Sequence, residues 1–421
     1  MNIYQTEQKG KRSFLEAITD FSFFMLVITT ILSVWETLRL ISSALLFGLV
    51  LLKIMKNRKI YFDQFLGFYY LFIVYNLLNS VQSVNQSVSI NIIYSNLLLN
   101  FISMVFVYNY ILHKNDNIQV LKIFAMAVVF SSIIIFVSSF GNISEMRLGT
   151  ATLFDRDPNI LSKMFAFAFL IYFYFILAKI ERKRAMLAVI WLFSLITLTG
   201  SRQGILYIAL GVTILVQTLY AKKFLRNMIL ISLIMIAGYL ILTQITVFYD
   251  IAGYRVENLL NFMSTDGVSE ASINTRNRYM NFGWSYIKEK PILGYGLGSF
   301  HYIQGSAVHA HSNVVDILFC CGIVGFLIFY TGMVITTVRA FRSGVKYNSL
   351  GFLLFSLTFV NLLLSYVGIV YFSFTALLII IIMAALSKNI IKTGNERCAY
   401  EKNKKHNSAY LFYSVQDYIQ N

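Results

Sequence analysis

The chain has 421 residues, of which 57% are hydrophobic and only 13% are charged, with a mean hydropathy of +0.67. Because a soluble domain carries about 25% charged residues, this composition excludes an ordinary soluble protein and predicts an all-α integral membrane protein. The net charge of +16 would suggest nucleic-acid binding in a soluble chain. Here we interpret the basic residues as anchors at the cytoplasmic membrane face and expect no nucleic-acid partner.

Apolar runs of membrane-spanning length recur along the whole chain and predict about twelve transmembrane helices. Their predicted ranges are 14–34, 38–55, 63–81, 92–112, 118–139, 159–178, 185–200, 203–220, 227–248, 313–337, 350–366 and 369–387. The first run follows Lys9, Lys11 and Arg12 but has no small-residue cleavage site after it. We therefore interpret it as a retained signal-anchor.

Clusters of lysine and arginine alternate with loops that are poor in charge. They precede the first span and follow spans two, six, eight, ten and twelve, so every cluster falls on one side. The positive-inside rule then predicts that both termini are cytoplasmic. The predicted organisation is a nine-span bundle (1–248), one large extracytoplasmic loop between spans nine and ten (249–312), a three-span part (313–387) and a basic cytoplasmic tail (388–421).

Three arginines are predicted to face the outside. Arg202 lies in "LTGSRQG", at the outer turn between spans seven and eight. Arg276 and Arg278 lie in "NTRNRYMNFGWSYIKEK", whose apolar spacing predicts an amphipathic helix near the membrane surface, ended by Pro291. Arg202 could be a snorkelling anchor, although such arginines are the rarer kind at the outer face, and Arg276 or Arg278 alone would be interpreted as a solvated residue. Together they favour an anion site, because guanidinium groups bind phosphate oxygens bidentately and a lipid-linked diphosphate would present such oxygens.

Three of the five histidines, His301, His309 and His311, lie in the same loop just before the tenth span. The spacing of His309 and His311 is that of a loop and not of a helical zinc pair, and no third ligand is evident, so we expect no metal. A buried structural histidine is the alternative to an acid–base or phosphate-contacting residue. "GYGLGSF" resembles a dinucleotide fingerprint only superficially, because no strand precedes it. Its glycines instead predict a sharp turn that re-enters toward the membrane, and we expect no cofactor.

Three separated segments resemble the O-antigen ligase/polymerase superfamily, which includes Wzy-type repeat-unit polymerases and WaaL-like ligases. They are "RLGTATLFDRDPN" (147–159), "LTGSRQG" (198–204) and the stretch 275–325, with its arginine, Pro-x-x-Gly-x-Gly turn, histidine and Gly-x-x-Gly. Two departures from the family pattern are the order Ser312–Asn313 after the histidine and the absence of a glutamate near Cys320.

The resemblance implies a metal-independent membrane glycosyltransferase of the bacterial cytoplasmic membrane. It would polymerise undecaprenyl diphosphate-linked oligosaccharide repeat units into capsular, exopolysaccharide or O-antigen polysaccharide on the outer side. The spacing of the motifs favours His311 as the catalytic histidine and Arg276 as the family's arginine, with Arg202, Arg278 and His309 also binding substrate. The implied partners are the lipid-linked glycans, membrane lipids, a chain-length regulator and a repeat-unit flippase.

Two alternatives stay open. A ligase would transfer finished polysaccharide to another acceptor, and the motifs barely separate it from a polymerase. A polysaccharide transporter or flippase would fit the number of spans, but it should show mid-span charges and internal repeats. The sequence has almost no mid-span charge, since Lys163 and Asp316 lie near span edges. The polar residues gather at one face instead, which favours an interfacial enzyme.

Overall fold

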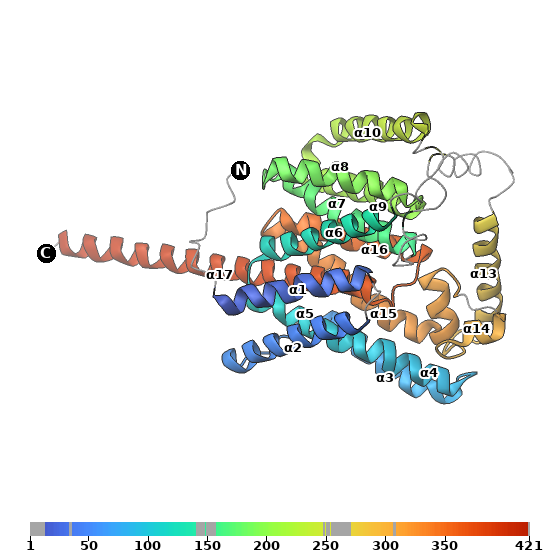
Figure 1. Ribbon diagram of the computed structural model, residues 1–421. Coiled ribbons are helices and arrows are strands. Elements are labelled where there is room, and N and C mark those ends of the chain that lie inside the picture. The colour runs from blue at the N-terminus through green and yellow to red at the C-terminus, as the bar shows by residue number, and fades with distance from the viewer. Residues whose placement is uncertain are drawn as a thin grey trace.

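The computed structural model describes residues 13–32, 36–139, 148, 157–246, 249, 253, 271–305 and 309–419. Within these residues the regular elements are all helices, most of them aligned in one bundle, with α13 lying across one end (Figure 1). The first half contains α1 (Phe14–Leu32), α2 (Glu36–Asn57), α3 (Gln64–Asn79), α4 (Gln86–Ile92), η2 (Ile93–Leu98), α5 (Leu99–Lys114), α6 (Asn117–Ser139), α7 (Pro158–Leu177), α8 (Arg182–Leu198), α9 (Arg202–Leu219) and α10 (Phe224–Gln244). The second half contains α13 (Ala271–Ile287), α14 (Ser299–Gln304), α15 (Asn313–Lys346), α16 (Leu350–Leu364) and α17 (Phe374–Ile419).

Each of the twelve predicted spans lies on a helix of the structure, and α4, η2 and α5 together form the fourth. Among the described residues, ten helices are long and apolar enough to cross a membrane. The other two are α3 and α8, with 16 and 17 residues. Helix α3 continues into the 3-10 helix η1 (Ser80–Gln82), and both segments agree with the predicted ranges 63–81 and 185–200 to within about three residues. The structure therefore confirms a multi-pass all-helical protein, with ten candidate spans where the sequence predicts about twelve.

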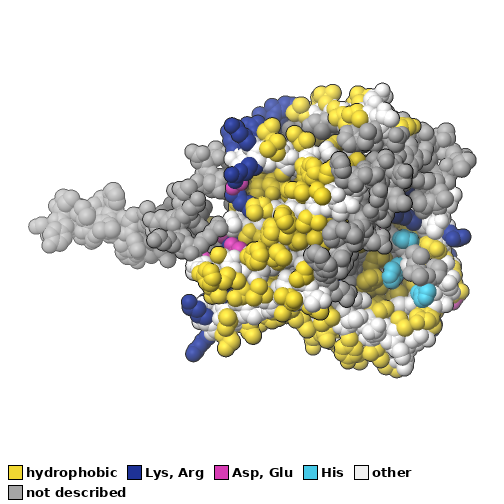
Figure 2. Space-filling view, viewed as in Figure 1, with side chains coloured by type: hydrophobic (Ala, Val, Ile, Leu, Met, Phe, Trp, Pro, Cys, Tyr) yellow, Lys and Arg dark blue, Asp and Glu magenta, His cyan; other side chains and the backbone are white. Residues whose placement is uncertain are grey.

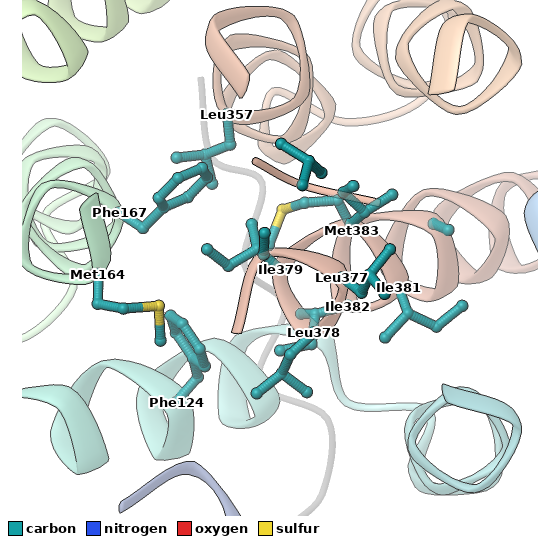
Figure 3. Packing of buried hydrophobic residues seen from close by; sticks show 14 of the residues in the cluster. Phe124, Met164, Phe167, Leu357, Leu377, Leu378, Ile379, Ile381, Ile382 and Met383 are labelled. Atoms are coloured by element: carbon teal, nitrogen blue, oxygen red, sulfur yellow. The ribbon is translucent and has the colours of Figure 1, made fainter. Parts of the chain in front are cut away.

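Helix α17 forms the centre of the bundle. It is the most deeply buried of the candidate spans and α10 is the least. Figure 3 shows Leu378 and Ile379 of α17 among Phe124 of α6, Met164 of α7 and Leu357 of α16, all of them buried. Because α17 is apolar on all sides over this stretch, it is suited to a position enclosed by other helices. The helix continues past residue 387, where the sequence predicted the tail to begin, as far as Ile419.

Helix α15 is interrupted at Gly322, whose φ of 61° and ψ of −169° are not helical. The break deprives nearby backbone groups of their helical partners, which would be costly inside a membrane. The turn between Pro291 and Gly296 supplies new partners. Four backbone hydrogen bonds join it to the break: Tyr295 N to Phe319 O (2.9 Å), Gly296 N to Cys320 O (2.8 Å), Ile323 N to Pro291 O (2.9 Å) and Val324 N to Ile292 O (3.3 Å).

The glycines of this segment form the sharp re-entrant turn that the sequence predicted. Gly294, Gly296 and Gly298 have φ values of 72°, 90° and 75°, in the left-handed region that favours glycine. A Cβ atom on Gly294 would lie 2.6 Å from the carbonyl oxygen of Phe319. The turn therefore needs glycine both for its conformation and for its close approach to α15.

Polar side chains of α3 hold the turn and the break together. The Tyr75 hydroxyl donates to the Cys321 carbonyl (2.6 Å), and the Asn79 amide donates to the Leu293 carbonyl (3.0 Å). The Cys321 thiol donates to Asn76 Oδ1 (3.1 Å). The short helix α3 thus contributes hydrogen bonds to a broken helix, as polar residues in membrane bundles commonly do.

The predicted orientation can be checked by labelling single cysteines. Ser285 is exposed on α13, and the native Cys398 is exposed near the predicted cytoplasmic end of α17, whereas Cys320 and Cys321 are buried. In intact cells, Ser285→Cys is expected to react with an impermeant maleimide while Cys398 reacts only after lysis. Labelling of Cys398 in intact cells, with Ser285→Cys protected, would reverse the orientation.

Candidate functional site

Helix α13 confirms the amphipathic helix predicted in the loop 249–312; residues 250–252, 254–270 and 306–308 of that loop lie outside the described residues. Phe282 of α13 packs on Phe300 of α14 (5.7 Å between ring centroids) and on Phe319 of α15 (6.5 Å). The helix ends at Ile287 rather than at Pro291, because the residues next to the proline form the turn that joins α15. Figure 1 shows α13 nearly perpendicular to the bundle axis, as a helix at the membrane surface would lie.

His311 lies immediately before α15, beneath α13. Its φ of 55° is left-handed, and its half-buried ring stacks on Tyr279 of α13, with centroids 6.0 Å apart and an angle of 24° between the rings. Ser312, which departs from the family pattern by standing between the histidine and the asparagine, is the N-cap of α15, and its hydroxyl accepts a hydrogen bond from Val315 N (3.4 Å). A serine is well suited to this capping position. The sequence therefore fixes where α15 starts relative to the histidine.

The loop that carries the two histidines is held by the connection between α16 and α17. Asp316, in the first turn of α15, accepts hydrogen bonds from Ala310 N (3.2 Å) and from the Tyr371 hydroxyl (2.8 Å). The His309 ring packs on Phe372, 5.0 Å between centroids. The contacts with Tyr371 and Phe372 join residues about 60 positions apart, and no sequence motif pointed to either of these two residues.

Asn313, the first residue of α15, also holds the connection between α16 and α17 in place. Its Oδ1 accepts hydrogen bonds from the backbone N–H groups of Val370 (2.7 Å) and Tyr371 (3.0 Å), and its amide donates to the Tyr330 hydroxyl (3.0 Å). Asn313 is buried, so all its hydrogen bonds come from protein groups. Both residues of the Ser312–Asn313 order, which departs from the family pattern, thus have structural roles in this chain.

Burial lowers the pKa of His311, and the positive charges of Arg276 and His309 lower it further, whereas Asp157 acts in the opposite direction. The electrostatic contributions show that all three residues lie near the His311 ring. A histidine with a lowered pKa is neutral at pH 7 and can accept a proton.

The two arginines of α13 have different surroundings. Arg276 is half-buried and lies close enough to His311 to affect its titration. Arg278 is exposed, and its guanidinium lies 5.6 Å from the Tyr279 ring centroid. Residues two apart on a helix point in different directions. The structure therefore brings Arg276 near His311 and leaves Arg278 exposed.

Arg202 is the first residue of α9, and its neighbours connect two of the sequence motifs. The Ser201 hydroxyl donates to Asn159 Oδ1 (2.9 Å), and Asp157 caps α7 by accepting from Asn159 N (2.8 Å). Because Asp157 also influences His311, the end of the segment 147–159 belongs to the same site. Of that segment, residues 147 and 149–156 lie outside the described residues.

The same end of the bundle collects the remaining elements. A Cβ atom on Gly368 would lie 3.5 Å from Gln203 Nε2, so the connection that carries Phe372 also passes beside the start of α9. Figure 2 shows histidine side chains together at this end, beside a recessed area, while most of the lysine and arginine visible in that view lies at the other end. Among the described residues, no three His, Cys, Asp or Glu side chains are grouped as a metal ion would require.

Comparison with known families finds a match to the O-antigen ligase family at residues 187–330, about a third of the chain. The matched stretch includes all five candidate site residues: Arg202, Arg276, Arg278, His309 and His311. It ends within α15, just past the break at Gly322. No curated protein matches the chain.

Proposed function

Because the match at residues 187–330 places this chain in the O-antigen ligase/polymerase superfamily, we propose that it polymerises undecaprenyl diphosphate-linked oligosaccharide repeat units at the outer face of the cytoplasmic membrane. The family supports a multi-pass membrane enzyme of polysaccharide assembly. The observation that carries the finer proposal is the grouping of His311, Arg276 and Asp157 at one end of the bundle, next to Arg202 on α9.

The arginines would bind the donor. Arg276 and Arg202 would pair with the diphosphate oxygens and stabilise the negative charge that develops as the carbon–oxygen bond to the diphosphate breaks. Arg278 and His309 would make weaker contacts, the first at the exposed surface and the second through its place beside Phe372. The apolar spans would accommodate the polyprenyl chain.

His311 would act on the acceptor. Its neutral ring would remove the proton from the attacking sugar hydroxyl as that oxygen forms a bond to the anomeric carbon of the donor. Undecaprenyl diphosphate would leave with the bonding electrons, and the proton on His311 would return to water. No metal or nucleotide sugar takes part in this scheme. A chain-length regulator and a repeat-unit flippase would be its partners in the membrane.

The arginine assignment predicts that Arg276→Ala lowers the rate of chain extension by about 100-fold or more, since a charge-assisted contact to the transition state is lost. Arg202→Ala is expected to do the same. Arg278→Ala is the matched control on the same helix and should cost about tenfold or less. The measurement is the glycan ladder formed by purified protein from undecaprenyl diphosphate-linked repeat units.

Lysine at position 276 should restore little activity, because a single ammonium group cannot reproduce the bidentate guanidinium contact. Full activity in both Arg202→Ala and Arg276→Ala would show that these residues do not bind the diphosphate.

The description of the matched family favours ligase activity as a second candidate. A ligase would use the same donor chemistry but would transfer a finished glycan once, to a different acceptor. The ladder assay separates the two, because a polymerase extends lipid-linked repeat units in regular steps when they are the only substrate. A ligase would give no ladder under that condition.

A further inference from the structure

Lys163 is a buried cation without an ionic partner in the described part of the chain. It lies in α7, within the candidate span Pro158–Leu177, and is only 9% exposed. No described carboxylate or hydrogen-bond acceptor contacts its ammonium group, whose close neighbour is the face of the Tyr207 ring, 5.6 Å from the centroid. A buried charge in a membrane is costly and usually indicates function.

Two other poorly exposed cations of the bundle, Lys114 and Arg339, are paired. Lys114 contacts Asp20 at 2.5 Å, and Arg339 forms an ion pair with Asp63. Both pairs satisfy the usual requirement that a buried charge be compensated. Lys163 differs from them, because a cation–π contact alone only partly replaces the water that an ammonium group loses on burial. The missing component is an anion.

The position of Lys163 connects it to the candidate site. A Cβ atom on Gly204 would lie 2.6 Å from the Cβ of Ser162, so α7 and α9 are in contact next to Lys163. Tyr207 follows Arg202 by five residues, which is about 7.5 Å along α9. Side chains on a helix point toward its N-terminus, and the N-terminus of α7 is Asp157, at the site. Lys163 therefore lies just below the site, on its membrane side.

A second donor beside Tyr207 also lacks an acceptor. The Tyr207 hydroxyl donates to Asn361 Oδ1 (3.2 Å), but the buried Asn361 Nδ2 has no hydrogen-bond partner among the described residues. The region between α7, α9 and α16 thus has an excess of donors, and a ligand rich in acceptor oxygens would complement it.

We propose that Lys163 binds phosphate oxygens of a polyprenyl diphosphate, at a greater depth than Arg202 and Arg276. The inference rests on the proposed function and adds a residue that would hold the lipid-linked end of the donor. A phosphoryl headgroup of an ordinary membrane lipid has the same chemistry, so the test must separate the two sources.

The test compares Lys163→Met and Lys163→Gln with the wild-type protein in nanodiscs of zwitterionic lipid. The probe is undecaprenyl diphosphate, and the readouts are its Kd and the Tm of the unliganded protein. Both variants are expected to bind the probe about 10- to 100-fold more weakly, as loss of a charged hydrogen bond implies. Their Tm should be unchanged or higher, because an uncompensated buried charge is removed.

Lys122→Met is the matched control, because Lys122 pairs with Glu181 at a partly exposed site on α6. It should leave the Kd unchanged.

Wild-type affinity in both Lys163 variants would overturn the inference, and so would full competition by phosphatidylglycerol at equal concentration, which would assign the site to a headgroup. If the wild type extends glycans while the Lys163 variants bind normally, only this inference fails. If the wild type neither binds the probe nor extends glycans, the proposed function fails with it.

Discussion

His311→Ala is expected to lower the rate of chain extension by about 10²–10⁴-fold, the usual contribution of a general base, whereas His309→Ala should cost about tenfold or less. His311 lies under α13 with Arg276 and Asp157 nearby, and burial keeps its imidazole neutral. His309 packs on Phe372 and so shapes the loop rather than presenting a free base. The glycan ladder formed by the two purified variants gives the measurement.

The pH profile separates a chemical role of His311 from a structural one. Because the pKa of His311 is lowered, activity should be constant above the ordinary histidine pKa of about 6.5 and should fall only as the pH drops through the lowered value. A chelator should have no effect on the rate. If His309→Ala is inactive and His311→Ala is active, the assignment is wrong, and inhibition by the chelator would contradict the metal-free scheme.

Gly322→Ala is expected to destabilise the protein severely, by more than about 4 kcal/mol. The φ of 61° and ψ of −169° at this position belong to a region that is essentially restricted to glycine. An added Cβ would also lie 2.1 Å from the carbonyl oxygen of Ile292. The variant must therefore release the turn 291–296 and with it the backbone hydrogen bonds across the break. Thermal unfolding of the detergent-purified protein measures the effect.

Gly305→Ala provides the control for backbone strain without a clash. Gly305 also has a positive φ, 80°, but none of the described residues lies within 4 Å of a Cβ built there. Its replacement should cost only about 1–2 kcal/mol, the usual penalty for a left-handed non-glycine residue. An equal fall in Tm for the two variants would show that the contact between the turn and α15 does not stabilise the bundle.

Local patterns were sufficient for the helices. Apolar runs predict a helix wherever they reach spanning length, because hydrophobic transfer acts residue by residue. The spacing of Phe282 and its neighbours likewise predicts α13, whose apolar side packs against α14 and α15. The same reasoning located α8 and the segment formed by α3 and η1 (Ser80–Gln82) to within about three residues of the predicted ranges 185–200 and 63–81.

The break in α15 is a feature that local sequence patterns do not predict. The apolar run from Val314 to Ile335 predicts one uninterrupted span, yet Gly322 is not helical. The break is stable because the turn 291–296, about 30 residues earlier, supplies backbone hydrogen bonds, and three polar side chains of α3 hydrogen-bond to the turn and to Cys321. These hydrogen-bond partners are set by the packing of distant segments. A short stretch of sequence therefore does not contain both the break and the groups that bond to it.

The sequence by itself determined the membrane class of this protein and the helix in its large loop, and its motifs indicated a resemblance to the superfamily that includes the O-antigen ligase family matched at residues 187–330. It also singled out His311 and Arg276 by motif spacing, which is a local property. Only the tertiary structure brought Asp157 close enough to His311 to affect its pKa, joined the histidine loop to Tyr371 through Asp316, and left Lys163 buried without a carboxylate among the described residues. These features depend on side chains from helices far apart in the chain, and their energies depend on burial, which exists only after the helices have packed.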